Sequence, residues 1–595
     1  MSIHEEEALG KAYDARLMRR LLGYLRPYRP QVVLALAAIV SGSLLQLAQP
    51  YLTKVAIDRY IASGNLAGLD RLAWLFLLVL AGSFVLEFTQ TWLMQNTGQR
   101  IMFDMRLQIY EHLQRLSLRD YDRNPVGRLM TRVTTDVDTL NELFSAGVVA
   151  IFGDVFTLAG IMAVLVWLDW RLAIVAFSVL PLIVLVTQWF RRNVRDSYRK
   201  VRVWIARINA FLQENITGMA TVQLFRREAR NHAAFDAINA EHREANIDSI
   251  FYYAVFYPAI EIVSAVAAAL IIWFGGGWVI QGTLTLGALV AFFQYSQRFF
   301  RPISDMSEKF NILQSAMASS ERIFKLLDTP VSVPAPAVPR ALPAGARGHL
   351  VFDQVWFAYD DADYVLRDVS FEVRPGERVG VVGATGAGKS TLINLLLRFY
   401  DVSRGRILVD GIDIRDLAFS DLRRLFGLVL QDVHLFSGTI EGNIRLGNLD
   451  ITQEQVRRAA EAVHAHAFIE RLPQGYATPV AERGATLSVG QKQLLSFARA
   501  LTFDPRVLIL DEATSSVDTD TELLIRDALH VLMAGRTTIA VAHRLSTIQD
   551  MDKILVLHKG ELRERGSHQE LLAQRGIYWR LYQLQYRDQE AAAGG

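Results

Sequence analysis

Six long apolar stretches occupy the first half of the chain, and they constrain its fold more than any other feature. An α-helix rises 1.5 Å per residue, so roughly 20 apolar residues are needed to cross a hydrocarbon core about 30 Å thick. Most of the stretches reach that length, and the fourth and sixth are near the short limit. The sequence therefore predicts six membrane-spanning helices, near residues 31–53, 72–94, 143–168, 172–190, 252–274 and 284–300.

The segments that join spans two and three, and spans four and five, are long and rich in arginine. Their helical apolar rhythm leads us to expect that the spans continue as helices beyond the bilayer. The positive-inside rule places these segments and both chain ends in the cytoplasm. Residues 1–30 are predicted to form a cytoplasmic N-terminal segment, with an interfacial amphipathic helix over 15–28 and no cleavable signal peptide.

Composition narrows the function further. The net charge is only +2 and the basic residues are scattered, so we expect no nucleic-acid partner. The chain has no cysteine, which excludes disulfides, thiolate metal sites and cysteine nucleophiles. Five of the sixteen prolines fall in residues 328–348, which read as a linker. The predicted domains are therefore a membrane domain over 31–327, the linker, a second domain over 349–583 and a tail over 584–595.

The second domain has the alternating pattern of an α/β fold. Short β-rich runs such as RVGVVG, VLILDE and TTIAVAH alternate with helical stretches. This domain is predicted to be soluble and to bind a nucleotide, because its motifs are those of a phosphate-binding site.

The segment GATGAGKS matches G-x-x-x-x-G-K-[ST] between a strand pattern and a helix pattern. Glycines let backbone N–H groups close around phosphate oxygens, and the following helix N-terminus favours negative charge there. Lys389 is expected to reach the β- and γ-phosphates of ATP, and Ser390 to ligate Mg²⁺. The predicted ATP-binding residues here are Gly383, Ala384, Thr385, Gly386, Ala387, Gly388, Lys389, Ser390 and Thr391.

A second apolar strand, residues 507–510, ends in Asp511 and Glu512. Ligands of α/β sheets bind at the carboxyl ends of strands. We expect Asp511 on the Mg²⁺ side and Glu512 as the general base that polarises the attacking water. An acidic pair after a strand is usually only a solvated strand end. The catalytic interpretation of Asp511 and Glu512 therefore depends on the phosphate-binding loop in the same domain.

With the segment LSVGQ at 487–491, residues 350–583 resemble the nucleotide-binding domain of ATP-binding cassette (ABC) transporters. The resemblance makes LSVGQ the signature motif, with Ser488, Gly490 and Gln491 binding the nucleotide of an opposing domain. It also implies a catalytic set of Glu512, His543 and Gln431, and Mg²⁺ ligands Ser390, Gln431 and Asp511. Tyr359 would stack on adenine, and residues 515–518 would form the D-loop, with Asp518 as its last residue.

The six spans with long helical extensions resemble the exporter class of that family. Runs such as LSVGQKQLLSFARAL and LVLHKG look most like bacterial multidrug-type half-transporters. The implied fold is an α-helical six-span exporter-type membrane domain followed by an α/β P-loop nucleotide-binding domain. The implied function is ATP-driven export or flipping of drugs or lipids across the bacterial cytoplasmic membrane. Residues 117–127 and 215–225 resemble coupling helices, and residues 478–484 resemble the loop that contacts them.

The resemblance also implies a dimer, since each ATP site would need the signature motif of a second chain. Many family signatures have glycine where this chain has Val489, and a β-branched residue restricts the backbone. We therefore favour a heterodimer with a second half-transporter, and a homodimer that tolerates the valine is the alternative. Two other functions stay open at this point: siderophore import on the same scaffold, and a non-hydrolytic ATP-gated channel or regulatory subunit.

Three acidic residues lie within otherwise apolar stretches. Such groups usually face a bundle interior or water, because exposure to lipid is costly. We expect Glu87, Asp154 and Glu261 to approach a substrate cavity and to favour cationic cargo. The alternative is that they pair with basic residues such as Arg298 or lie in the cytoplasmic extensions.

Overall fold

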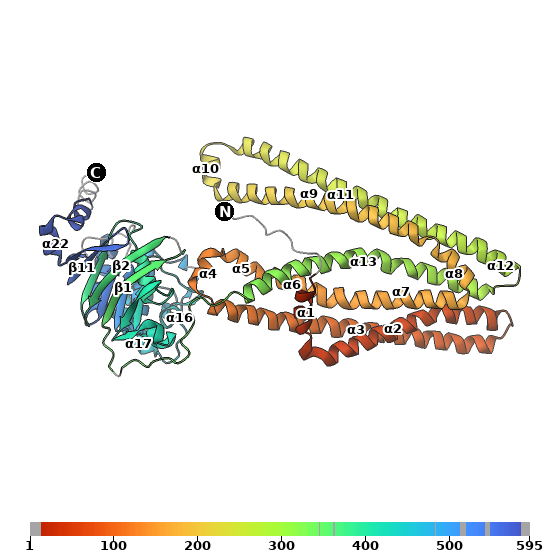
Figure 1. Ribbon diagram of the computed structural model, residues 1–595, viewed down its shortest axis with the longest axis horizontal. Helices are drawn as coiled ribbons and strands as arrows, with labels where there is room; N and C mark the ends of the chain where they lie inside the picture. Colours follow the sequence, from red (N-terminus) through yellow and green to blue (C-terminus); the bar gives the residue numbers. More distant parts are fainter. Residues whose placement is uncertain are drawn as a thin grey trace. The chain divides into compact units, whose positions relative to one another are not determined.

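The computed structural model describes residues 14–343, 345–360, 363–481, 484–511, 519–541 and 548–584. Contacts divide the chain into two compact units. The helical unit comprises Met1–Gln114 and Val126–Thr329, and the α/β unit comprises Arg115–Pro125 and Pro330–Gly595. Figure 1 shows the elements of each unit.

The helical unit contains long helices linked by short turns. Its helices are α1 (Ala15–Gly23), α2 (Arg29–Val55), α3 (Leu66–Arg115), α5 (Val126–Val133), α6 (Thr135–Glu142), α7 (Val148–Leu168), α8 (Trp170–Phe177), α9 (Leu180–Thr217), α10 (Met219–Leu224), α11 (Glu228–Leu270), α12 (Gly276–Ile280) and α13 (Leu286–Leu327). Shorter turns of 3₁₀ or π helix are η1 (Arg26–Tyr28), η2 (Ala56–Ile61), η3 (Leu143–Gly147) and η4 (Ile271–Gly275).

Five helical segments within the described ranges are long and apolar enough to cross a membrane. They are Arg26–Ile61, Leu66–Arg115, Ile151–Leu168, Trp170–Thr217 and Glu228–Ile280. The predicted sixth span lies at the start of α13, which is 42 residues long. The helices α3, α9 and α11 have 50, 38 and 43 residues, which is longer than the roughly 20 residues that a bilayer requires.

The fourth predicted span consists of two helices rather than one. α8 ends at Phe177 and α9 begins at Leu180. Pro181 lies in the first turn of α9 and has no N–H to donate to the carbonyl of Phe177 four residues earlier. The break at Ser178 and Val179 follows from this missing donor, and regular helical bonding resumes where the amide of Ile183 donates to the carbonyl of Val179.

The helical unit is held together by packing along α13 and along the α9–α11 pair. α9 and α11 run side by side and are joined by α10 (Figure 1). α13 packs on α2, α6 and α7. Its aromatic side chains Phe292, Tyr295 and Phe299 are buried in the core of the unit, so packing explains that stripe.

The N-terminus of α13 is capped by a carboxylate from η2. Asp58 accepts hydrogen bonds from the Thr285 hydroxyl at 2.7 Å and from the Gly287 amide at 2.8 Å, and its carboxylate lies 3.1 Å from Lys54. A carboxylate at a helix N-terminus satisfies free N–H groups and the helix dipole. This cap fixes the first turn of α13 against the end of α2.

The α/β unit contains two larger sheets and a short two-stranded antiparallel sheet of β7 and β8. Its strands are β1 (Leu350–Ala358), β2 (Tyr364–Val373), β3 (Arg378–Val382), β4 (Arg404–Val409), β5 (Ile412–Asp413), β6 (Phe426–Val429), β7 (Gly438–Thr439), β8 (Pro479–Val480), β9 (Val507–Asp511), β10 (Thr537–Val541), β11 (Lys553–His558) and β12 (Glu561–Gly566). Its helices are α4 (Leu118–Arg123), α14 (Lys389–Leu396), η5 (Ile414–Asp416), α15 (Phe419–Arg424), α16 (Ile440–Arg445), α17 (Gln453–Ala462), α18 (His466–Glu470), η6 (Gly475–Ala477), α19 (Val489–Thr502), α20 (Thr519–Met533) and α22 (His568–Gln574).

The central sheet has the strand order β12-β11-β3-β10-β9-β6. Its pairs are parallel except for β11 with β12. β10 is buried at every position and β9 at every position before Asp511, as expected for strands covered on both faces. A second, antiparallel sheet has the order β2-β1-β4-β5. The predicted fold class, a helical membrane domain followed by an α/β domain, is confirmed.

The short helix α4 belongs to the α/β unit, although the chain reaches it long before β1. The Arg123 side chain forms an ion pair with Asp360, and the Ser117 hydroxyl lies 2.5 Å from that of Ser332. α4 lies within the predicted coupling segment, residues 117–127. The other predicted coupling segment, residues 215–225, includes α10 of the helical unit.

Candidate functional site

The predicted site residues follow three parallel strands of the central sheet, in which β10 lies between β3 and β9. The phosphate-binding loop follows β3, Asp511 ends β9, and Gln431 lies two residues after β6. The carboxyl ends of parallel strands meet at the same edge of a sheet, where ligands of α/β folds bind. The topology therefore gathers these residues at one edge of the sheet.

Two glycines give the phosphate-binding loop its shape. Gly386 and Gly388 have φ values of +81° and +102°, which side-chain-bearing residues rarely adopt. At Gly383, a Cβ atom would lie 2.4 Å from the carbonyl oxygen of Leu557, so any larger residue would push the loop off β11. The loop then enters α14, with Gly388 as its N-cap, so free N–H groups of the first turn remain for an anion.

Lys389 is buried, and its ammonium group is held by the loop itself. It donates to the carbonyl oxygens of Gly383 at 2.8 Å and Ala384 at 3.2 Å. Burial lowers the pKa of the Lys389 ammonium, and the Asp511 carboxylate acts in the opposite direction. A cation whose closest acceptors are neutral carbonyls is well suited to a phosphate, so the residues present fit a nucleoside triphosphate.

Tyr359 lies close to this loop, as a residue that stacks on a nucleotide base should. Its hydroxyl is 3.1 Å from the hydroxyl of Thr391 on α14. Its ring meets that of Tyr400 edge to face, with 5.2 Å between centroids. The base-stacking role of Tyr359 stays a prediction.

Three predicted residues fall outside the described part of the chain: Glu512, Asp518 and His543. His543 follows β10, whose described residues end at Val541. Gln431 is exposed to solvent after β6. The catalytic assignments of Glu512, His543 and Gln431 therefore stay predictions.

The signature segment begins a helix. Ser488 is the N-cap of α19: its hydroxyl accepts from the Gln491 amide at 3.2 Å, and the Gln491 side chain accepts from the Ser488 amide at 3.0 Å. Gln491 is thus occupied in capping, while the Ser488 hydroxyl keeps its own O–H as a donor. Within the described residues, no contact joins Ser488 or Gly490 to the phosphate-binding loop of the same chain.

Val489 is the first residue of α19 and is 53% exposed. It does not have the positive φ that favours glycine. The part of our interpretation that rested on restricted backbone angles is therefore wrong, because a helical first turn suits valine. Only the bulk of its exposed side chain distinguishes it from glycine.

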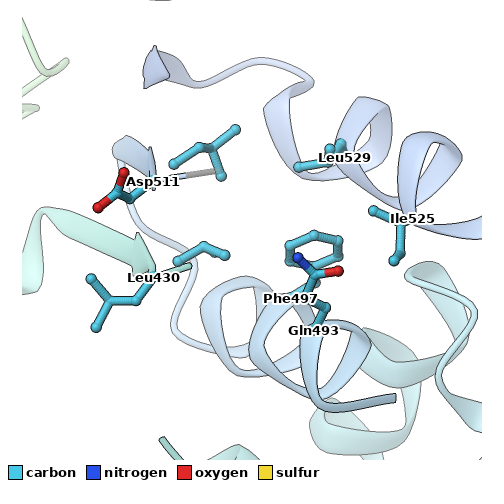
Figure 2. A pocket seen from close by; sticks show the side chains of 8 residues that line it. Leu430, Gln493, Phe497, Asp511, Ile525 and Leu529 are labelled. Atoms are coloured by element: carbon cyan, nitrogen blue, oxygen red, sulfur yellow. The ribbon is translucent and has the colours of Figure 1, made fainter. Parts of the chain in front are cut away.

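A small pocket beside Asp511 lies between α19, the helix that begins at the signature segment, and the central sheet (Figure 2). It is bounded by the ends of β6 and β9 and by α19 and α20. Among the described residues, Gln493 Oε1 is buried there without a hydrogen-bond partner, and sequence reasoning missed it. The residues labelled around the pocket are Leu430, Gln493, Phe497, Asp511, Ile525 and Leu529.

The three acids of the membrane spans have different surroundings. Asp154 of α7 forms an ion pair with Lys309 of α13, and both side chains are largely buried. Asp154 thus pairs with a basic residue, as the alternative described, but the partner is Lys309 and not Arg298, whose guanidinium donates to two neutral oxygens of α2. Glu87 and Glu261 are exposed on α3 and α11. No local pattern could have found Lys309, because it lies on a different helix from its partner.

Comparisons with known proteins agree with this geometry. Residues 32–303 match the family model of the ABC transporter transmembrane region, and residues 366–515 match that of the ABC transporter. An uncharacterized ABC transporter ATP-binding protein of Bacillus subtilis, YknV, is 39% identical and aligns over 98% of this chain and 96% of its own length. An ATP-dependent lipid A-core flippase of Syntrophus aciditrophicus is 36% identical over 96% of this chain and 95% of its own.

A solved structure has the same fold over nearly the whole chain. It is described as a bacterial Atm1-family ABC exporter with ATP bound. Its TM-score is 0.76 with 31% identity, covering 96% of this chain and 99% of the other.

Proposed function

This chain belongs to the ABC transporters, as an ATPase coupled to transport, and from that premise we propose that it exports or flips amphipathic small molecules or lipids as one half of a dimer. The observation that carries the proposal is the fusion of the two family regions in one chain, residues 32–303 and 366–515. A relative similar over almost the whole chain is named a lipid flippase, which supports an amphipathic substrate.

ATP with Mg²⁺, when bound, supplies the free energy that drives closure and reopening of the dimer. In our proposal, Lys389 and the backbone amides of its loop hold the phosphates, and Tyr359 holds the base. Ser390, Gln431 and Asp511 hold Mg²⁺, and Glu512 takes the proton of the attacking water. His543 positions the transferred phosphate. Catalysis of this kind is mainly positioning and charge stabilisation.

We infer that a second chain completes each ATP site. Ser488 offers a free O–H donor at the N-terminus of α19, which is a place where anions bind. Since the described contacts do not bring Ser488 to Lys389 of the same chain, the phosphate that Ser488 binds would belong to the partner. Alternating access would then follow from closure and separation of the two nucleotide-binding domains.

We favour a heterodimer, for a steric reason only. The exposed Val489 side chain would face the partner's nucleotide, and a standard glycine would leave more room there. The replacement Val489→Gly tests this in the chain expressed alone. If valine limits the site, the variant should have several-fold higher ATPase activity than the parent. A parent homodimer with full substrate-stimulated ATPase and transport would contradict the heterodimer.

We place the protein in the bacterial cytoplasmic membrane, with both termini and the α/β unit in the cytoplasm. The arginine-rich segments support this orientation. The test of the whole proposal is reconstitution of the purified full chain, alone and with a candidate partner, in lipid vesicles. ATP should drive movement of a fluorescent lipid between leaflets or of a fluorescent drug across the membrane. Absence of any ATP-dependent movement, with ATPase intact, would argue against export and flipping.

A further inference from the structure

Arg298 is the only charged residue in the predicted sixth span, residues 284–300, and its guanidinium contacts a span that has no charged residue at all, residues 31–53. It lies about 18 Å along α13 from Leu286, more than halfway through a hydrocarbon core about 30 Å thick. A cation at such a depth is costly unless it has a partner or faces water. Its surroundings therefore indicate what it does.

Two neutral oxygens of α2 hold the guanidinium. One terminal nitrogen of Arg298 donates to the carbonyl oxygen of Gln46 at 2.7 Å, and the other donates to the side-chain oxygen of Gln49 at 2.7 Å. The Gln46 carbonyl is available because Pro50, four residues later in α2, has no N–H to donate to it. Proline thus creates the acceptor that fixes Arg298.

This anchoring fixes the guanidinium without neutralising it. A guanidinium has five N–H donors, and the two described bonds use two of them. The basic side chains of neighbouring elements are arranged differently: Lys54 pairs with Asp58, and Lys309 pairs with Asp154. Arg298 makes no ion pair with a carboxylate among the described residues, and its side chain is exposed in the protomer. The guanidinium therefore keeps its positive charge and three N–H donors that the two described bonds do not use.

We propose that Arg298 binds the anionic headgroup, a phosphate or a carboxylate, of an amphipathic substrate. The planar guanidinium fork matches both groups with two parallel hydrogen bonds. The surrounding apolar spans accommodate the acyl or aromatic part of the same molecule. The inference rests on the proposed function, because it names the substrate class of that transporter. It opposes the expectation of cationic cargo, because one of the three acids behind that expectation, Asp154, is paired with Lys309.

The test uses ligands that differ only in their headgroup. The full chain is placed in nanodiscs of zwitterionic lipid, and binding of dodecyl phosphate, dodecanoate, dodecylphosphocholine and dodecyltrimethylammonium is measured by calorimetry below their micellar concentrations. The parent chain should prefer at least one anionic ligand to the zwitterionic one by about tenfold or more, as a charge-assisted hydrogen bond gives. The stronger of dodecyl phosphate and dodecanoate identifies the headgroup.

Arg298→Gln should remove this preference, since glutamine can still donate to Gln46 but has no charge. Arg298→Lys keeps the charge and loses the fork, so it should retain part of the preference and serves if the glutamine variant does not fold. Arg71→Gln, which removes a charge from the exposed start of α3, is the matched control and should bind all four ligands like the parent. An unchanged preference in folded Arg298→Gln, or a parent that favours the cationic ligand, would overturn the inference.

The outcome separates this inference from the proposed function. A chain that binds dodecyl phosphate through Arg298 but moves no amphiphile with ATP supports the inference and contradicts export. A chain that transports amphiphiles with the same headgroup preference before and after Arg298→Gln supports export and overturns the inference.

Discussion

The hydroxyl of Tyr400 donates a hydrogen bond to the carboxylate of Asp122 on α4, a helix that belongs to the α/β unit although it precedes β1 by more than 200 residues in the sequence. Tyr400 is buried, and its ring packs edge to face on that of Tyr359. Burial and this hydrogen bond both raise the pKa of the Tyr400 phenol, so it stays protonated and remains a donor. The Tyr400 side chain therefore contacts both Tyr359, the predicted base-binding residue, and α4.

Tyr400→Phe should weaken the link between substrate and ATP hydrolysis. Phenylalanine keeps the ring against Tyr359 and loses the bond to Asp122, which contributes about 1 kcal/mol. ATP affinity should change less than about threefold, while the stimulation of ATPase by substrate falls. Tyr476→Phe is the matched control, because it removes a hydroxyl that contacts His466 at 2.9 Å inside the α/β unit. Equal stimulation in all three proteins would rule out a coupling role for Tyr400.

Glu512→Gln should leave ATP binding largely intact and reduce hydrolysis by about 10²- to 10⁴-fold, because glutamine keeps the size and loses the basicity. Lys389→Ala should instead weaken nucleotide binding, since it removes the buried cation of the loop. Both are measured on the assembled dimer, by nucleotide binding and by phosphate release. Turnover of Glu512→Gln equal to that of the parent would contradict the assignment of Glu512 as general base. Unchanged ATP affinity of Lys389→Ala would contradict the assignment of residues 383–390 as the phosphate-binding loop.

Ser488 has two roles in our reading, and one matched pair separates them. Ser488→Ala removes the N-cap of α19 and the predicted phosphate donor. Thr452→Ala removes an equivalent capping box from α17, where Thr452 pairs with Gln455. Each should lower the free energy of unfolding by about 1 kcal/mol. Only Ser488→Ala should also reduce ATPase activity by tenfold or more; similar activity in the two folded variants would leave Ser488 with capping alone.

His568 predicts a pH dependence of stability. Its Nδ1 lies 2.6 Å from the hydroxyl of Tyr578, and burial lowers the pKa of the imidazole below the ordinary 6.5. The unfolded chain therefore takes up this proton at a higher pH than the folded chain does. The stabilising contribution is complete above pH 6.5 and is lost as the pH falls below that value.

His568→Gln should consequently make the melting temperature of the full chain less sensitive to pH between 7 and 5. The measurement is thermal unfolding of the parent and the variant at both pH values. His530→Gln, at an exposed position of α20, is the control. A parent-like pH dependence in His568→Gln would contradict the assignment.

Much of this architecture could be predicted from local patterns, because local patterns determine it. Apolar length predicted the spans, and the loop GATGAGKS requires glycines at positions where the backbone has positive φ. Ser488 could be placed at a helix start because it lies before a helical pattern and forms a capping box with Gln491.

The parts that sequence reasoning missed depend on which helices become neighbours. The pairing of Asp154 with Lys309 and the bond from Tyr400 to Asp122 join residues that are 155 and 278 positions apart. No periodicity records such a pairing. The acceptor that holds Arg298 illustrates the same limit: Pro50 is visible in the sequence, but the donor that compensates for it comes from another helix.

The inclusion of α4 in the α/β unit has a consequence for biosynthesis. Residues 115–125 leave the ribosome about 200 residues before Pro330, where the rest of the unit begins. Asp122 and Arg123 can therefore form their contacts with Tyr400 and Asp360 only after the later spans have been synthesised. A gene fragment that begins at residue 330 would encode a nucleotide-binding domain in which Tyr400 and Asp360 lack their partners on α4. A separate peptide of residues 115–125 should bind to this domain and supply those partners.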